Sequence, residues 1–120
     1  LPALMRAIKL QNRAARVGFD WPETTQVLEK VSEEIAELRA AETPEHQTEE
    51  FGDLLFVMAN LARHMNIDPE AALRQANAKF TRRFGAIETA LAKEGRSPTD
   101  STLTEMDALW DAAKQAERQG

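Results

Sequence analysis

A chain of 120 residues is long enough for one folded domain, since soluble domains commonly contain about 100 to 150 residues. Its residues are 42% hydrophobic and 29% charged, which is typical of a folded protein and too apolar for a disordered tail. The formal net charge of -5 argues against non-specific binding to a nucleic-acid polymer, which needs a basic face. The absence of cysteine excludes disulfides and thiolate metal sites, so oxygen or imidazole atoms must provide any metal ligands.

No apolar stretch reaches the roughly 20 residues that span a bilayer, and the first segment is amphipathic. We therefore expect no membrane partner, and the lack of cysteine suits a reducing cytoplasm. The chain begins at Leu1 rather than at Met, which indicates either processing or excision from a longer, two-domain protein. Both origins stay open, and we predict a single domain over residues 1–120.

Proline and glycine divide the chain into segments whose apolar residues recur at helical rather than alternating spacing. The first predicted helix covers about Pro2–Arg16. In the second, Asp20 and Glu23 are spaced as a capping box and Pro22 lies in the first turn. This helix is predicted to continue to about Ala41.

The third and fourth predicted helices begin with the same pair of signals, a capping residue followed by proline. Thr43 precedes Pro44 at the start of the third helix, which is predicted to end at about Met65. The fourth helix follows Asp68 and its proline, and it is predicted to end just before Gly95.

A polar loop is predicted over Ser97–Ser101, and Thr102 with Glu105 forms a capping box that opens the last helix. The sequence contains no strand signal, and each helix is apolar on one stripe only. We therefore predict an all-α fold, an antiparallel bundle of four or five helices. Apolar surface left exposed by so small a domain favours pairing with a second copy, so we expect a homodimer.

Two consecutive helices carry carboxylates at matching positions. With about 100° of rotation per residue, Glu34 and Glu37 lie roughly 70° and 130° from the centre of their helix's apolar stripe. Glu50 and Asp53 lie at the same offsets, in the same sense, on the next helix. If the two helices are antiparallel neighbours, Glu37 is level with Glu50 and Glu34 with Asp53. The sequence therefore predicts that four carboxylates converge.

Converging carboxylates repel one another unless cations compensate them, and Mg²⁺ or Mn²⁺ suits hard oxygen ligands. The alternative is that these residues are solvated glutamates on helix surfaces. A di-iron site is disfavoured, because neither His46 nor His64 follows a glutamate by three residues. We expect surface or packing roles for both histidines.

The sequence EEIAE at residues 33–37 and the sequence EEFGDLLF at residues 49–56 resemble the EExxE and ExxD signature of MazG-type nucleotide pyrophosphohydrolases. Further similarity lies in VGFDW at 17–21, NLARH at 60–64 and ANAKFTRRF at 76–84. The resemblance covers nearly all 120 residues, apart from a short segment around 41–48.

The resemblance implies an all-α pyrophosphatase that forms a homodimer and hydrolyses standard or modified nucleoside triphosphates to monophosphate and pyrophosphate. It also implies that a Mg²⁺-activated water attacks the substrate. The metal ligands that it implies are Glu34, Glu37, Glu50 and Asp53. Glu33 is expected in a supporting role, either orienting water or binding a further ion.

Cations and aromatic residues in the last two helices are candidates for contact with the nucleotide. Lys79 and Arg83 lie one helical turn apart and could grip successive phosphates. Trp110 could equally belong to the core. The predicted substrate-binding residues are Asn77, Lys79, Arg82, Arg83, Trp110 and Lys114. Weaker candidates for a base pocket are Lys9, Gln11, Asn12 and Trp21.

Two alternative functions remain at this point. One is a pyrophosphatase restricted to a single nucleotide, such as dUTP or dCTP, which substrate profiling would identify. The other is a non-catalytic dimerisation or regulatory module whose acids only keep it in solution, in which case neither Mg²⁺ nor Mn²⁺ would bind.

Overall fold

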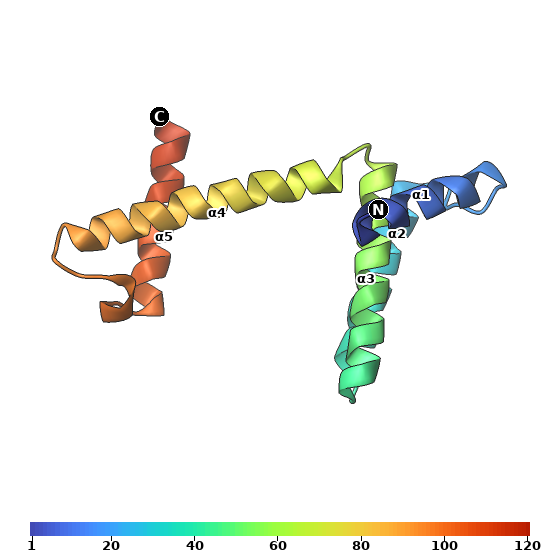
Figure 1. The fold of residues 1–120 in the computed structure, drawn as a ribbon, viewed down its shortest axis with the longest axis horizontal. Coiled ribbons are helices and arrows are strands. Elements are labelled where there is room, and N and C mark those ends of the chain that lie inside the picture. Colours follow the sequence, from blue (N-terminus) through green and yellow to red (C-terminus); the bar gives the residue numbers. More distant parts are fainter. The chain divides into compact units, whose positions relative to one another are not determined.

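The computed structural model describes residues 1–120 and consists of five α-helices and one short 3₁₀ turn, without strands. The all-α class predicted from the sequence is therefore confirmed. None of the helices combines the length and the apolar character that crossing a bilayer requires. Coloured in chain order in Figure 1, the helices are α1 (Ala3–Arg16), α2 (Thr24–Ala40), α3 (Pro44–His64), α4 (Pro69–Ala92) and α5 (Leu103–Gln119).

The predicted starts of α3 and α4 are confirmed by hydrogen bonds at their first turns. The side chain of Thr43 accepts a hydrogen bond from the backbone N–H of His46 at 3.1 Å. Asp68 accepts one from the backbone N–H of Glu70 at 3.0 Å. Each bond satisfies a backbone donor that has no partner inside the helix, so these two starts follow from local sequence alone.

The predicted capping box of Asp20 and Glu23 is wrong, because α2 begins one turn later. The backbone N–H of Glu23 donates to Gln26 Oε1 at 3.1 Å, so Glu23 is the capping residue. Asp20 instead pairs with Arg63 and lies 2.8 Å from His64 Nε2. Two polar side chains at the end of α3, one of them a guanidinium, therefore replace the single backbone donor expected for this carboxylate.

The chain forms two compact units, residues 1–72 and residues 73–120. The predicted single domain thus stays a prediction. In the first unit, α3 contacts both α1 and α2 (Figure 1). Only residues 41–43 join α2 to α3, so the two helices pack as antiparallel neighbours. Buried Val27 and Ala59 lie in this unit, together with the buried polar residues Gln11, Glu34 and Glu50.

In the second unit, α4 and α5 meet through aromatic and charged side chains. The ring of Phe80 lies 5.7 Å from that of Trp110, and the guanidinium of Arg83 lies 5.3 Å from the Trp110 ring centre. Ile87 and Leu91 of α4 are buried. Packing and a cation–π contact thus join the two helices.

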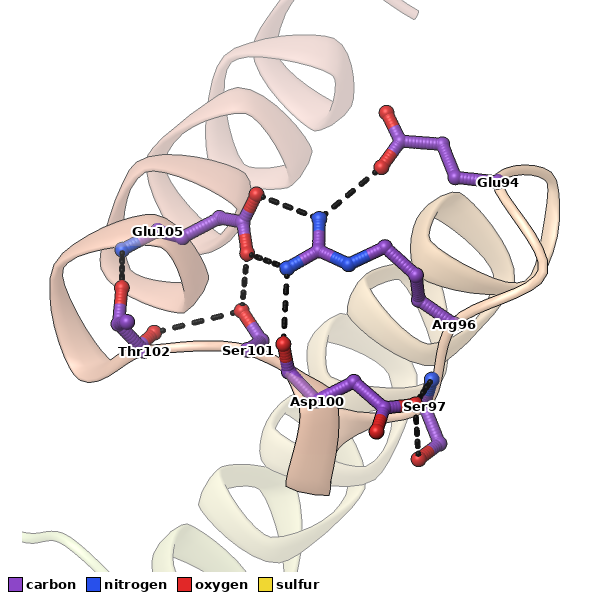
Figure 2. A network of polar contacts seen from close by, with 7 residues as sticks. All are labelled: Glu94, Arg96, Ser97, Asp100, Ser101, Thr102 and Glu105. Carbon is purple, nitrogen blue, oxygen red and sulfur yellow. Dashed lines mark hydrogen bonds and ion pairs between the residues drawn. The ribbon is translucent and has the colours of Figure 1, made fainter.

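Arg96 organises the connection between α4 and α5 (Figure 2). Its guanidinium donates to Glu105 Oε1 at 2.6 Å, to Glu94 Oε2 at 3.1 Å and to the carbonyl oxygen of Asp100 at 3.0 Å. Arg96, assisted by the hydroxyl of Ser101, lowers the pKa of Glu105 to about 2. The connection is therefore fixed by ionic hydrogen bonds rather than by apolar packing.

The predicted loop Ser97–Ser101 is more ordered than expected, because Pro98–Asp100 form a 3₁₀ turn. The predicted capping box at α5 is half formed. Thr102 Oγ1 accepts from the backbone N–H of Glu105 at 3.1 Å, but the side chain of Glu105 binds Arg96 instead of reaching back. A charged partner has displaced the weaker backbone contact.

Candidate functional site

Three carboxylates from two helices converge in the first unit. Glu34 of α2 and Glu50 and Asp53 of α3 each offer an oxygen atom, and these three atoms lie within 4.8 Å of one another. Glu50 and Asp53 share a helix face because they are three residues apart, and the antiparallel packing of α2 brings Glu34 beside them. Glu34 and Glu50 are buried, and Asp53 is exposed. We call these three residues the acid cluster.

Each buried glutamate of the acid cluster has only one of its two oxygens paired. Glu34 Oε1 lies 3.6 Å from Lys30 Nζ, and Glu50 Oε1 lies 3.1 Å from His46 Nε2. The Oε2 atoms of Glu34 and Glu50 are buried and have no hydrogen-bond partner. An ionised carboxylate oxygen buried without a partner is costly, and a cation between the two would remove that cost.

The spacing of the acid cluster is compatible with one shared metal ion. Oxygen atoms that bind one Mg²⁺ at about 2.1 Å lie roughly 3 to 4 Å from one another, so a small contraction of the observed 4.8 Å limit is enough. Hard carboxylate ligands with one exposed side also leave room for water and phosphate oxygens. The acid cluster can therefore hold a metal ion.

The structure places the other two predicted acids outside the acid cluster. Glu33 is exposed and forms an ion pair of 3.3 Å with Lys30, and this contact raises the pKa of the lysine. Glu37 is exposed as well. The catalytic and metal roles of both residues stay predictions.

Lys30 and His46 were not singled out for the site by the sequence, although both lie beside it. Each precedes its buried glutamate, Glu34 or Glu50, by four residues on the same helix. That spacing brings side chains together on one helix face and is the signal that could have identified them. His46 therefore contacts a cluster residue, whereas the sequence led us to expect only a surface or packing role.

A cavity of about 500 Å³ in the first unit adjoins the acid cluster, and Glu34 and Asp53 line it. Sites for small molecules commonly have volumes of about 300 to 1,000 Å³. The apolar part of the lining includes Leu10, Trp21 and Phe56. The cavity lining thus combines carboxylates with apolar side chains. Of the four weak candidates for a base pocket, Gln11 and Trp21 line it, whereas Lys9 and Asn12 do not.

The loop between α1 and α2, residues 17–23, forms part of the cavity wall. Gly18 turns the chain out of α1 with a φ of +89°, a conformation that side chains other than glycine rarely adopt. Asp20 then ties the loop to Arg63 and His64 of α3, and Arg63 holds the pKa of this carboxyl below its usual value. An ion pair between residues far apart in the sequence therefore sets the position of this wall.

Some of the residues predicted to contact nucleotide in the second unit already bind other side chains of the chain. Arg82 Nε and Arg83 Nη2 each lie 2.9 Å from an oxygen of Glu117, and the two arginines, Arg83 first, lower its pKa to about 2. Arg83 also lies over Trp110, which is half-buried. Of the remaining predicted contacts, Lys79 is exposed and Lys114 is half-buried, and neither forms an ion pair. Asn77, which carries no charge, is exposed.

Residues 1–80 match the phosphoribosyl-ATP pyrophosphohydrolase family. The chain is 44% identical over 114 residues to the nucleoside triphosphate pyrophosphohydrolase/pyrophosphatase MazG of Thermotoga maritima, covering 95% of this chain and 45% of that protein. It is 45% identical over 122 aligned positions to a nucleoside triphosphate pyrophosphohydrolase of Escherichia coli K12, covering 98% of this chain and 46% of the relative. It thus spans about half the length of these curated relatives. An uncharacterised protein of Bacillus subtilis, YabN, is 49% identical over 69 residues, which are 58% of this chain and 14% of YabN.

Proposed function

The chain belongs to the phosphoribosyl-ATP pyrophosphohydrolase family, and we propose that it hydrolyses nucleoside triphosphates to the monophosphate and pyrophosphate with Mg²⁺. One observation carries this proposal: an acid cluster that contains two buried carboxylate oxygens without partners adjoins, through Glu34 and Asp53, a cavity large enough for a nucleoside. The names of the two relatives that align with almost all of the chain support the choice of substrate class.

Glu34, Glu50 and Asp53 would hold the metal, for which Mn²⁺ is also suitable. Glu37 is proposed as a fourth ligand, and Glu33 as a supporting acid that acts on water or on a further ion. A divalent cation in this place would polarise the phosphoryl oxygens and offset charge that develops during the reaction. Lys30 and His46 keep one oxygen of each buried glutamate in place, which leaves the other oxygen to face the cation.

The proposed reaction is a substitution at the α-phosphorus. The oxygen of a water molecule bonds to this phosphorus, the bond from the phosphorus to the oxygen that bridges to the β-phosphate breaks, and pyrophosphate leaves. A carboxylate of the acid cluster accepts a proton from the water. The apolar walls of the cavity hold the nucleoside, so the reacting phosphate lies toward Glu34 and Asp53.

We retain the six residues of the second unit as proposed nucleotide contacts. Lys79 and Lys114 are the most available charges, because they form no ion pair within the chain. Arg82 and Arg83 would bind phosphate only by sharing or losing their bonds to Glu117. The interaction of both arginines with one carboxylate supports an affinity of this pair for a bidentate anion.

The pattern of exposed apolar residues supports the proposed homodimer. Phe19 is 82% exposed, Phe80 57%, and Phe51 and Leu55 are each 51% exposed. Large apolar side chains are thus exposed on both units, which is more apolar surface than a monomer usually leaves exposed. We propose a second copy of this chain as the partner, and no membrane or nucleic-acid polymer.

Incubation of the purified chain with Mg²⁺ and each standard nucleoside triphosphate tests the proposal. Separation of the products by anion exchange should show monophosphate and pyrophosphate rather than diphosphate and phosphate. Glu50→Gln and Asp53→Asn should each reduce kcat by about a hundredfold or more, because loss of even a group that supports a metal ligand costs 10- to 100-fold.

Glu49→Gln is the matched control, since Glu49 is an exposed acid adjacent to Glu50 and is not part of the site. It should keep the activity of the wild type. Undiminished activity of Glu50→Gln would rule out the proposed metal role. Absence of Mg²⁺ and Mn²⁺ binding by calorimetry, with and without a non-hydrolysable nucleotide, would favour the non-catalytic module instead.

A further inference from the structure

Gln11 of α1 carries a buried polar atom without a partner, and this residue is not a member of the acid cluster. The residue is only 8% exposed and lines the cavity. Its amide Nε2 donates to the backbone carbonyl of Phe56 at 2.9 Å. A carbonyl can only accept, so the nitrogen of the amide must face Phe56 and the oxygen must face the other way. The hydrogen bond to Phe56 thus determines which side of this amide carries the nitrogen and which the oxygen.

The remaining atom, Gln11 Oε1, is buried and has no hydrogen-bond partner in the chain. A buried acceptor normally has a donor, and a ligand that brings an N–H group would provide one. Asn60 lines the same cavity, and its Oδ1 is already bound by Arg63 Nε at 3.1 Å. Gln11 therefore adds a buried acceptor without a partner to a cavity lining that also includes Glu34, whose Oε2 has no partner either.

The other residues that line the cavity indicate which kind of ligand Gln11 would meet. The carboxylates of Glu34 and Asp53 line the same cavity, and under the proposed function a metal and phosphates would lie beside them. Leu10 and Trp21 provide apolar surface of the kind that packs against a planar ring. A ring with an N–H donor at its edge, as in a nucleobase, matches this combination.

We propose that Gln11 is a specificity-determining residue, and that its Oε1 accepts a hydrogen bond from an N–H group at the edge of the substrate's base. The inference rests on the proposed function, because it assigns a base contact in the same cavity. Adenine and cytosine have an amino group, and guanine and uracil have a ring N–H, so one acceptor fits every standard base. Bases that lack this donor leave the buried oxygen without a partner, and the site rejects them.

Pairs of substrates that differ in one donor test the proposal. ATP is compared with purine riboside triphosphate, CTP with the triphosphate of pyrimidin-2-one riboside, and UTP with its N3-methyl derivative. For the wild type, kcat/KM should be about tenfold or more higher for the parent triphosphate than for its analogue, chiefly because KM is lower for the parent. In Gln11→Met, the parent should fall to the level of its analogue, so that the ratio approaches one.

Gln47→Met is the matched control, because Gln47 also donates its amide to a backbone carbonyl, that of Ala41, but lies outside this cavity. It should keep the wild-type ratios. Gln11→Glu separates recognition from packing, since it keeps an acceptor oxygen and loses the donor to Phe56. Its ratio should stay above one, and circular dichroism should show that each variant is folded.

Three results would overturn the proposal. The wild type could cleave every analogue as well as its parent, or the ratio could persist in Gln11→Met. Alternatively, Gln11→Glu could lose the ratio together with Gln11→Met, which would mean that Gln11 acts only by supporting Phe56. If no parent releases pyrophosphate, the proposed function fails and this assignment fails with it. Cleavage of parents and analogues alike overturns the Gln11 assignment alone.

Discussion

The acid cluster of α2 and α3 and the arginine pair of α4 and α5 are two charged regions that differ in how completely the chain neutralises them. Arg82 and Arg83 bind both oxygens of Glu117, and Arg83 also lies over an aromatic ring. In the acid cluster, the second oxygens of Glu34 and Glu50 are buried without any partner. The first region is neutralised within the chain, whereas the second could bind a cation from outside.

This difference separates charged residues that stabilise the fold from charged residues that are candidates for ligand binding. Charges that neutralise one another stabilise the fold whether or not they also bind a ligand, whereas a buried set that stays unpaired is costly and persists where a ligand completes it. The same reasoning separates Gln11, with its free acceptor, from Arg96, whose guanidinium is bound by Glu94, Asp100 and Glu105.

The largest expected effect on stability comes from completing the acid cluster with a metal. Mg²⁺ at 100 times its dissociation constant should stabilise the folded chain by about 2.7 kcal/mol, because it binds the folded state only. Thermal melts should then shift upward by roughly 10 °C or more. Glu50→Gln should abolish the shift, and Glu49→Gln should preserve it. A shift of the same size in Glu50→Gln would show that Mg²⁺ acts elsewhere.

Single charge removals should have opposite signs in the two regions when a chelator keeps metals away. Glu34→Gln should stabilise the metal-free chain by about 1 kcal/mol, because it removes a buried charge beside two other acids. Glu117→Gln should lower the melting temperature, since it leaves two arginines without their shared partner.

The controls for this comparison are Glu29→Gln on α2 and Glu88→Gln on α4, both exposed acids outside the two regions. Neither should change the free energy of unfolding by more than a few tenths of a kcal/mol, so the melting temperature should stay nearly the same. Melts of all four variants in the presence of EDTA provide the measurement. If Glu34→Gln and Glu117→Gln shift stability in the same direction, the two regions do not differ in how completely the chain neutralises them.

The smallest effect is expected from acid acting on the region that is already complete. Arg83 and Arg82 lower the pKa of Glu117 from 4.5 to about 2, so this carboxylate binds protons less readily when folded. Its stabilising contribution is fully present above about pH 4.5 and is lost as the pH falls toward 2. Melting temperatures measured across this interval should therefore fall less steeply for Glu117→Gln than for the wild type. An unchanged slope would contradict the role of this ion pair, and Glu88→Gln should keep the wild-type slope.

Local sequence was enough to predict five helices, although not the start of α2, and the acids that share a face of one helix. Thr43 and Asp68 begin α3 and α4 as predicted, because a side-chain oxygen and a proline within a few residues determine a helix start. Glu50 and Asp53 were predicted to lie on one face, because their spacing of three residues fixes the angle between them. The resemblance to the MazG family also followed from sequence, and the comparisons confirm it.

Tertiary structure alone decided which side chains from different helices meet. Helical periodicity fixes the direction of a residue around its own helix, but not its level along a neighbouring one. Glu34 therefore joins Glu50 and Asp53 while Glu37 stays outside the acid cluster, although the sequence favoured all four equally. Tertiary contacts also determine which partner a side chain binds. Asp20 pairs with Arg63 on α3 instead of capping α2, because a charged partner brought close by folding outweighs a single backbone donor nearby in the chain.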